Sequence, residues 1–146
     1  YRIKDFGKFY YDENIKGDVV LLGAGSGIAP LRSIAHYIVE KQLPARVHLV
    51  YSNKTQQDII MKDELLALEE HSNNMECHFT LTREPEDSEW EGRRGRIDYE
   101  FFEDAIGFLQ DKWYFLCGPK EFVMNMEDIL KAHNVSAERI KKEIYG

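Results

Sequence analysis

The segment VVLLGAGSGIAPLRSI, residues Val19–Ile34, passes from an apolar run into three glycines at alternate positions and then into a proline. A short apolar run rich in β-branched residues is typical of a buried parallel strand, and Pro30 suits the first turn of a helix. Glycines at such a junction let backbone N–H groups approach an anion, and the helix N-terminus adds partial positive charge. The segment therefore predicts a strand, a phosphate-binding turn and a helix, with a pyrophosphate as the natural ligand.

The same alternation of strand and helix continues along the chain. Apolar or alternating runs predict further strands at residues 46–52, 76–82, 112–118 and 139–146. Helices are predicted after Pro30, after a cap at Thr55, from a cap at Asp98 through Phe108, and from Pro119 to a stop at Asn134. This pattern indicates an α/β fold with helices on both faces of a parallel sheet. We expect five strands in the order 3-2-1-4-5, and the charged segment 83–97 is expected to be a binding or mobile loop.

Length and composition limit the classes of protein that fit. With 146 residues, 43% of them hydrophobic, the chain suits one domain with an ordinary core. The net charge of −7 disfavours a nucleic-acid-binding protein, because affinity for phosphate backbones comes largely from Lys and Arg. No apolar run approaches the roughly 20 residues that a membrane-spanning helix needs.

The cysteines and histidines predict neither a disulfide framework nor a metal centre. Cys77 and Cys117 form no CxxC motif, and the five histidines are scattered without the spacing of metal ligands. We therefore expect the histidines at the surface. Unpaired cysteines indicate a reducing compartment, so the cytoplasm is the expected location.

A glycine-rich turn alone is compatible with several functions. A P-loop requires a terminal GK[ST], which the residues IAP after the turn do not provide. A nucleophile elbow requires G-x-S-x-G, but Ala24 occupies the first glycine position. The Rossmann fingerprint lacks its third glycine at Ile28 and an acidic residue after the second strand. A methyltransferase-type G-x-G-x-G and a turn without any ligand remain open, the former matching Gly23, Gly25 and Gly27.

A second motif, FLCGP at residues 115–119, distinguishes between these alternatives. It ends the fourth predicted strand, beside the glycine turn at the point where the strand order reverses and ligands bind. The pair GSGIAPLRSI and LCGPKEF resembles the nicotinamide-binding half of the ferredoxin–NADP⁺ reductase superfamily, which includes cytochrome b5 reductases and oxygenase reductases. The resemblance extends from Asp18 to Gly146. It implies a ferredoxin reductase-like C-terminal NAD(P)-binding domain at residues 17–146, preceded at residues 1–16 by the remnant tail of an upstream flavin-binding domain.

The resemblance also implies roles for residues on both sides of the crevice. The turn would hold the dinucleotide pyrophosphate through Gly25, Ser26, Gly27, Ile28, Ala29 and Pro30. Ser26 would lie near the nicotinamide, or else cap the helix as a small turn residue. Cys117 would help to position nicotinamide C4 against flavin N5, lined by Gly118, Pro119 and Phe122, where the family commonly has Met. We expect a positive φ at Gly27, and we expect Gly27→Val to block dinucleotide binding without unfolding the chain.

The adenosine and flavin ends of the site follow from the same resemblance. Ser52, Asn53, Lys54 and Arg83 would surround the adenosine ribose. Two cations with a serine and no acid there favour NADPH over NADH, because a 2′-phosphate prefers such groups. Glu143 and Tyr145 would lie close to the flavin ring.

The implied reaction is hydride transfer from nicotinamide C4 to flavin N5 for onward electron transfer. This chain would bind NAD(P)H, and an N-terminal flavin-binding domain or subunit would hold most of the FAD or FMN, so the chain alone is expected to be inactive. No nucleic-acid partner is expected, and the electron acceptor is not identified. Two alternatives remain: a stand-alone nucleotide-binding regulatory module without flavin, and an S-adenosylmethionine-dependent methyltransferase.

Overall fold

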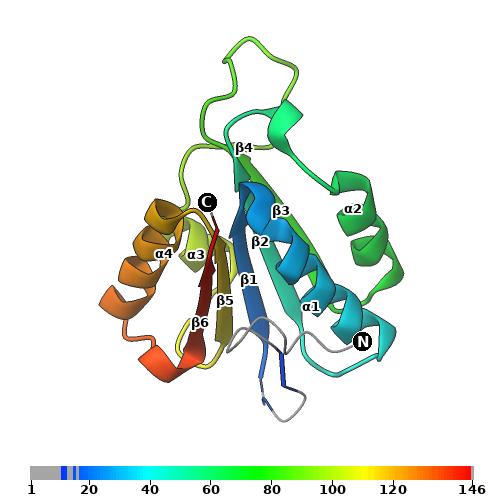
Figure 1. Ribbon diagram of the computed structural model, residues 1–146, viewed down its shortest axis with the longest axis vertical. Helices are drawn as coiled ribbons and strands as arrows, with labels where there is room; N and C mark the ends of the chain where they lie inside the picture. The colour runs from blue at the N-terminus through cyan, green and yellow to red at the C-terminus, as the bar shows by residue number, and fades with distance from the viewer. Residues whose placement is uncertain (1–10, 13–14, 16, 146) are drawn as a thin grey trace.

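The apolar runs of the sequence form a single parallel sheet in the computed structural model, which describes residues 11–12, 15 and 17–145 (Figure 1). Within these residues the sheet has six strands in the order β4-β3-β2-β1-β5-β6. They are β1 (Val19–Ala24), β2 (Val47–Asn53), β3 (Met75–Leu81), β4 (Arg93–Arg94), β5 (Trp113–Gly118) and β6 (Ile140–Ile144). Every pairing is parallel, so the carboxyl ends of the strands lie along one edge of the sheet.

Helices cover both faces of this sheet, as expected for alternating strands and helices (Figure 1). On one face, α1 (Ile28–Glu40) and α2 (Lys62–His71) contribute Leu31, Ile34 and Leu65 to a core that includes Leu21 and Leu49. On the other face, α3 (Tyr99–Ala105) and α4 (Lys120–Ala132) pack their own apolar side chains on the sheet. The two cores hold the central strands β1, β2 and β5 between them.

The predicted order of the five main strands is confirmed, and the predicted number is wrong by one. The sixth strand, β4, consists of Arg93 and Arg94 paired with Thr80 and Leu81 of β3. It lies within the charged segment that was expected to be only a loop. Two consecutive arginines carry no apolar alternation, so the pattern that identifies buried strands could not detect this edge pairing.

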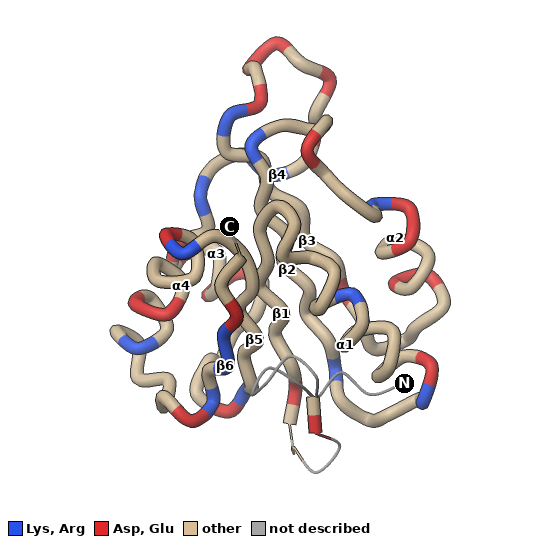
Figure 2. The backbone as a smooth tube through the Cα atoms, in the orientation of Figure 1, with Lys and Arg blue, Asp and Glu red and all other residues tan. Residues whose placement is uncertain are grey.

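The segment before β4 is held in place by one arginine side chain. The Arg94 guanidinium donates hydrogen bonds to the carbonyl oxygens of Glu84, Pro85 and Trp90 and to the hydroxyl of Ser88, at 2.9–3.2 Å. Acidic residues colour much of this loop in Figure 2, and Arg93 and Arg94 lie at its base. The loop is therefore closed by its own internal contacts.

Two of the predicted helix boundaries need correction. Thr55 caps a short 3₁₀ turn at Gln56–Asp58, where Asp58 completes a capping box, and α2 begins only at Lys62. The Asp98 cap is confirmed, because its Oδ1 accepts a hydrogen bond from the Phe101 amide at 2.9 Å. That helix nevertheless ends at Ala105 rather than Phe108. Gly107 follows with a φ of 88°, and Phe108 is 64% exposed, so no apolar contact extends the helix.

The upstream tail predicted at residues 1–16 lies mostly outside the described residues. Of the part that is described, Tyr11 is buried and packs against Tyr37 and Phe115, with ring centroids 6.4 Å apart in both pairs. Ile15 also contacts the core on the α1 face. These two side chains thus contribute to the packing of the domain itself.

The turn from β1 to α1 depends on a close approach of two backbones. A Cβ on Gly27 would lie 2.6 Å from the Cys117 carbonyl carbon and 2.8 Å from the Gly118 nitrogen, distances that real Cβ atoms do not adopt. Its φ is −69°, so the expected positive φ at Gly27 is wrong, and lack of space is what requires glycine. Gly25 has the positive φ, 56°, and apart from its two chain neighbours none of the described residues lies within 4 Å of its Cβ position.

These two glycines therefore predict different stability losses. Gly27→Ala forces β5 away from the turn and lowers the free energy of unfolding by about 2–3 kcal/mol, as overpacking does. Gly25→Ala adds only the strain of a left-handed backbone, about 1 kcal/mol. Urea denaturation followed by circular dichroism compares the two variants with the parent chain. Equal and small losses of unfolding free energy in the two variants would contradict the prediction, because they would mean that the turn can move away from β5 without an energetic cost.

Candidate functional site

The glycine turn and the second motif lie side by side at the carboxyl edge of the sheet. Gly23 of β1 is paired with Cys117 of β5. The strands that follow β1 in the sequence, β2 to β4, lie on one side of it in the sheet, and β5 and β6 lie on the other side. Strand order reverses here, which is where open parallel sheets bind ligands. A Cβ on Gly118 would also lie 3.2 Å from the Ala24 carbonyl oxygen, so the two motifs are in contact through their backbones on both sides.

The residues of the turn divide into a buried and an exposed set. Ile28 and Pro30 are buried and fasten the start of α1 onto the sheet, while Ser26 and Ala29 are exposed. The first turn of α1 contains no acidic residue, so no carboxylate of that turn offsets the partial positive charge of the helix N-terminus. The N-cap of α1 is Gly27 and no side chain caps it, so the alternative in which Ser26 caps the helix is not found.

Tyr51, which was not among the predicted site residues, forms a hydrogen bond with the backbone of the glycine turn. Its side chain is fully buried on β2, and its hydroxyl donates a hydrogen bond of 2.6 Å to the Gly25 carbonyl oxygen. The same hydroxyl accepts a longer bond, 3.4 Å, from the Ile60 amide. Burial raises the pKa of Tyr51, so the hydroxyl keeps the proton that it donates. The sequence signals only a buried residue at this position, because a hydrogen bond across 26 residues leaves no local pattern.

The four predicted adenosine-side residues meet at the ends of β2 and β3. Ser52 and Asn53 are buried, whereas Lys54 and Arg83 are exposed and joined by a 2.8 Å hydrogen bond from the Arg83 amide to the Lys54 carbonyl oxygen. The Asn53 amide lies beside the Tyr51 hydroxyl, but its buried nitrogen makes no hydrogen bond of standard geometry within the described residues.

An acidic residue also lies at this edge, contrary to the expectation that none is present. The Glu84 carboxylate accepts hydrogen bonds from the amide and side chain of Gln56 at 2.9 and 2.6 Å. These bonds lower the pKa of Glu84, so it is ionised at neutral pH. Sequence analysis missed it because Glu84 follows β3, whereas the acid of a dinucleotide site is normally sought after β2.

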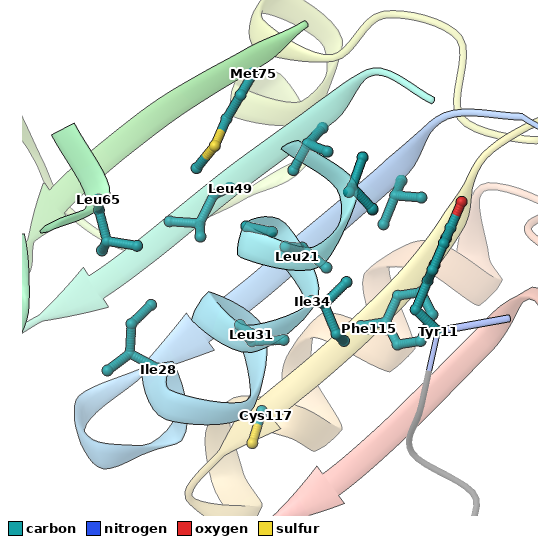
Figure 3. Packing of buried hydrophobic residues seen from close by; sticks show 14 of the residues in the cluster. Tyr11, Leu21, Ile28, Leu31, Ile34, Leu49, Leu65, Met75, Phe115 and Cys117 are labelled. Atoms are coloured by element: carbon teal, nitrogen blue, oxygen red, sulfur yellow. The ribbon is translucent and has the colours of Figure 1, made fainter. Parts of the chain in front are cut away.

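The residues predicted for the nicotinamide and flavin end also come together. Cys117 is paired with Glu143 of β6, and the Tyr145 amide donates a 2.8 Å hydrogen bond to the Gly118 carbonyl oxygen. Figure 3 shows the Cys117 side chain on the same face of the sheet as Leu31 and Ile34. Burial, reinforced by the charge of Glu143, raises the pKa of Cys117 to about 12, so it is a neutral thiol. Burial likewise raises the pKa of Tyr145.

The two remaining predicted residues lie at the start of α4. Pro119 has an extended backbone and is the N-cap of the helix, as predicted. Phe122 is half-buried and packs against the core between the sheet and α3–α4, on the face opposite to Cys117.

None of the described helices is long and apolar enough to cross a membrane.

Comparison with known proteins gives a consistent result. Residues 21–128 match the model of the oxidoreductase NAD-binding domain family. The chain is 34% identical over 119 residues to NADH-cytochrome b5 reductase 2 of Saccharomyces cerevisiae, an alignment covering 80% of this chain and 39% of that protein. It thus spans about two fifths of the length of the curated relatives it matches.

Solved structures agree with this match. The flavohem-like FAD/NAD-binding domain of nitric oxide dioxygenase from Vibrio cholerae superimposes with a TM-score of 0.82 at 25% identity, covering 96% of this chain and 55% of that chain. The CS-b5R domains of human Ncb5or, in an NAD⁺ form, superimpose with a TM-score of 0.78 at 26% identity, covering 97% and 39%. The chain therefore belongs to the oxidoreductase NAD-binding domain family and is related to the NADH-cytochrome b5 reductases.

Proposed function

We propose that this domain binds NADH or NADPH across the carboxyl ends of β2, β1 and β5 and presents the nicotinamide to a flavin held by another domain. The observation that carries the proposal is the backbone contact between the glycine turn and the Cys117–Gly118 segment at the point where strand order reverses. Together with the family match, it favours this function over the methyltransferase alternative.

The phosphate end of the ligand fits the exposed part of the turn. Space is open at the Cβ position of Gly25, and the N-terminus of α1 follows directly. Tyr51 fixes the Gly25 carbonyl oxygen and so keeps it from turning toward an incoming phosphate. Ser26, exposed at the crest of the turn, is available to the ligand because it caps no helix.

The adenosine end fits the edge formed by Ser52, Asn53, Lys54 and Arg83. Ser52 and Asn53 would line the ribose, and the two exposed cations are suited to a 2′-phosphate. The negative charge of the Glu84 carboxylate would disfavour a 2′-phosphate at this edge. The curated relatives are named as NADH enzymes. We propose NADH as the preferred donor, with Lys54 and Arg83 supplying a residual affinity for NADPH.

At the nicotinamide end, the protein residues would position the nicotinamide ring and would not act as a general acid or base. When bound, the nicotinamide and flavin supply the hydride chemistry, and the protein supplies orientation and a dry crevice. Cys117 suits this role as an uncharged, buried side chain that excludes water and does not compete as a nucleophile. Glu143 and Tyr145, beside it on the last strand, are proposed to face the flavin.

The flavin partner follows from the length of the relatives. A related structure is described as an FAD/NAD-binding domain, and this chain covers 55% of it. We propose that a flavin-binding domain or subunit, N-terminal to this domain, completes the enzyme, and that the electron acceptor docks on that assembly. A regulatory module without flavin would bind the nucleotide equally well but would show no electron transfer.

The nucleotide site predicts a specific effect of one hydroxyl. Isothermal titration of the chain should show binding of NADH and NADPH and no binding of S-adenosylmethionine. Tyr51→Phe leaves the Gly25 carbonyl oxygen without its donor, so NADH affinity falls about fivefold and stability by about 1 kcal/mol. Tyr114→Phe is the matched control, because its buried hydroxyl donates a 2.8 Å bond to the Leu109 carbonyl oxygen away from the site. It loses similar stability and keeps NADH affinity; equal losses of affinity would contradict the role of Tyr51.

The adenosine edge predicts a change in nucleotide selectivity. Replacing both Lys54 and Arg83 by Ala removes the cations that favour a 2′-phosphate. NADPH affinity then falls by about tenfold or more, since charge-assisted contacts contribute roughly 1.5–3 kcal/mol and these side chains are exposed. NADH affinity changes by less than about twofold. Titration of both nucleotides measures the ratio, and parallel losses for NADH and NADPH would make the two residues ordinary surface charges.

The flavin end predicts that the chain is colourless and inactive with NADH and ferricyanide until it is joined to an N-terminal flavin domain carrying FAD. In that assembly Cys117→Ala lowers kcat about tenfold with little effect on NADH affinity, because it disturbs ring alignment and not pyrophosphate binding. Cys77→Ala, a half-buried thiol on β3, is the control and leaves kcat unchanged. A yellow, active preparation of this chain alone would overturn the proposal, and so would a kcat indifferent to Cys117.

A further inference from the structure

The sheet carries a second cluster of polar side chains near the end opposite to the glycine turn. His48 is the second residue of β2, and Glu76 of β3 lies directly beside it in the parallel register. His78 follows two positions later on β3, on the same face. One possible ligand atom from each of the three residues lies within 4.8 Å of the other two. The three side chains therefore form a compact group on the α3 side of the sheet, where His78 contacts Phe101.

The two histidines of this cluster are not the surface residues expected from the sequence. His48 is only 4% exposed, and its Nδ1 has no hydrogen-bond partner among the described residues. The same holds for Nε2 of His78, which lies 3.6 Å from the Glu76 carboxylate, too far for a hydrogen bond. Buried polar atoms are normally paired, so two unpaired nitrogens beside a carboxylate point to a partner that accepts their lone pairs.

The surrounding charges are balanced. Arg46 lies 3.8 Å from the Glu76 carboxylate, which is a long ion pair, while Asp18 and Lys112 act on His48 with opposite signs. Glu69 adds negative charge near His78.

We propose that His48, Glu76 and His78 bind a divalent transition-metal ion, Zn²⁺ or a similar borderline metal. Two imidazoles and one carboxylate are a donor set that zinc accepts, with a fourth position left for water. Bonds of 2.0–2.2 Å require donor atoms about 3.4 Å apart, so the cluster must contract on binding. The buried His48 is fixed, and the partly exposed side chains of Glu76 and His78 supply that movement.

The position of the cluster gives the ion a structural role. Within the described residues, β3 is flanked by β4 only at Thr80 and Leu81, so its first half is an edge of the sheet. A metal held between β2 and β3 would fasten this edge. The site lies about 13 Å along β2 from Ser52, so it is separate from the proposed nucleotide site.

Zinc titration of the full chain tests the proposal. Isothermal titration with Zn²⁺ alone should give one equivalent bound, with a rise in Tm. In Glu76→Gln/His78→Gln, two near-isosteric changes, affinity should fall by more than about 100-fold, since loss of mere outer-shell partners already costs 10–100-fold. His36→Gln is the matched control, because His36 pairs with Glu40 on the exposed side of α1 at 3.3 Å, outside the cluster. It should keep the parent affinity.

Cobalt spectroscopy identifies the ligands independently of stability. Co²⁺ bound to nitrogen and oxygen donors should give visible d–d bands without a thiolate charge-transfer band, and Cys77→Ser should leave that spectrum unchanged. The proposal is overturned if the parent chain binds no stoichiometric Zn²⁺. It is equally overturned if the double variant retains the parent affinity, or if binding depends on Cys77.

Discussion

The backbone contact between Gly27 and the Cys117 carbonyl group is the constraint on which the carboxyl edge of the sheet depends. It leaves no room for a side chain at position 27 and fixes the start of α1 relative to β5. Because β5 also pairs with β6, the position of Glu143 and Tyr145 is set by the same contact. A dinucleotide spanning this edge would therefore meet a surface whose parts are already fixed relative to one another, so little ordering energy is spent on binding.

The last two glycines of the turn, Gly25 and Gly27, serve different physical purposes. Gly27 is needed by the fold, since a Cβ would enter β5, and Gly25 is needed where the chain turns and faces open space. A positive φ was expected at Gly27, and it is found at Gly25 instead. A motif identifies a set of glycines that must be present, but it does not say which neighbour each of them accommodates.

Local patterns predicted the elements that local physics determines. Buried strands, the Asp98 cap and the strand order follow from apolar runs, capping chemistry and right-handed crossovers. Contacts between distant segments were beyond reach, as with Tyr51 and Gly25, Glu84 and Gln56, and the grouping of His48 with Glu76 and His78. In each case the partners come together only through strand pairing or the packing of loops. The spacing of these residues along the chain therefore does not predict the contact.

Arg94 closes the charged loop between β3 and β4 from the base of that loop. Its guanidinium binds four acceptors between Glu84 and Trp90, so the loop is held mainly by contacts within itself. The entropic cost of lengthening a closed loop grows slowly with its length. Changes of length in this loop that keep Arg94 and its acceptors should therefore accumulate among homologues without altering the sheet, which makes this loop a natural place for lineage-specific surfaces.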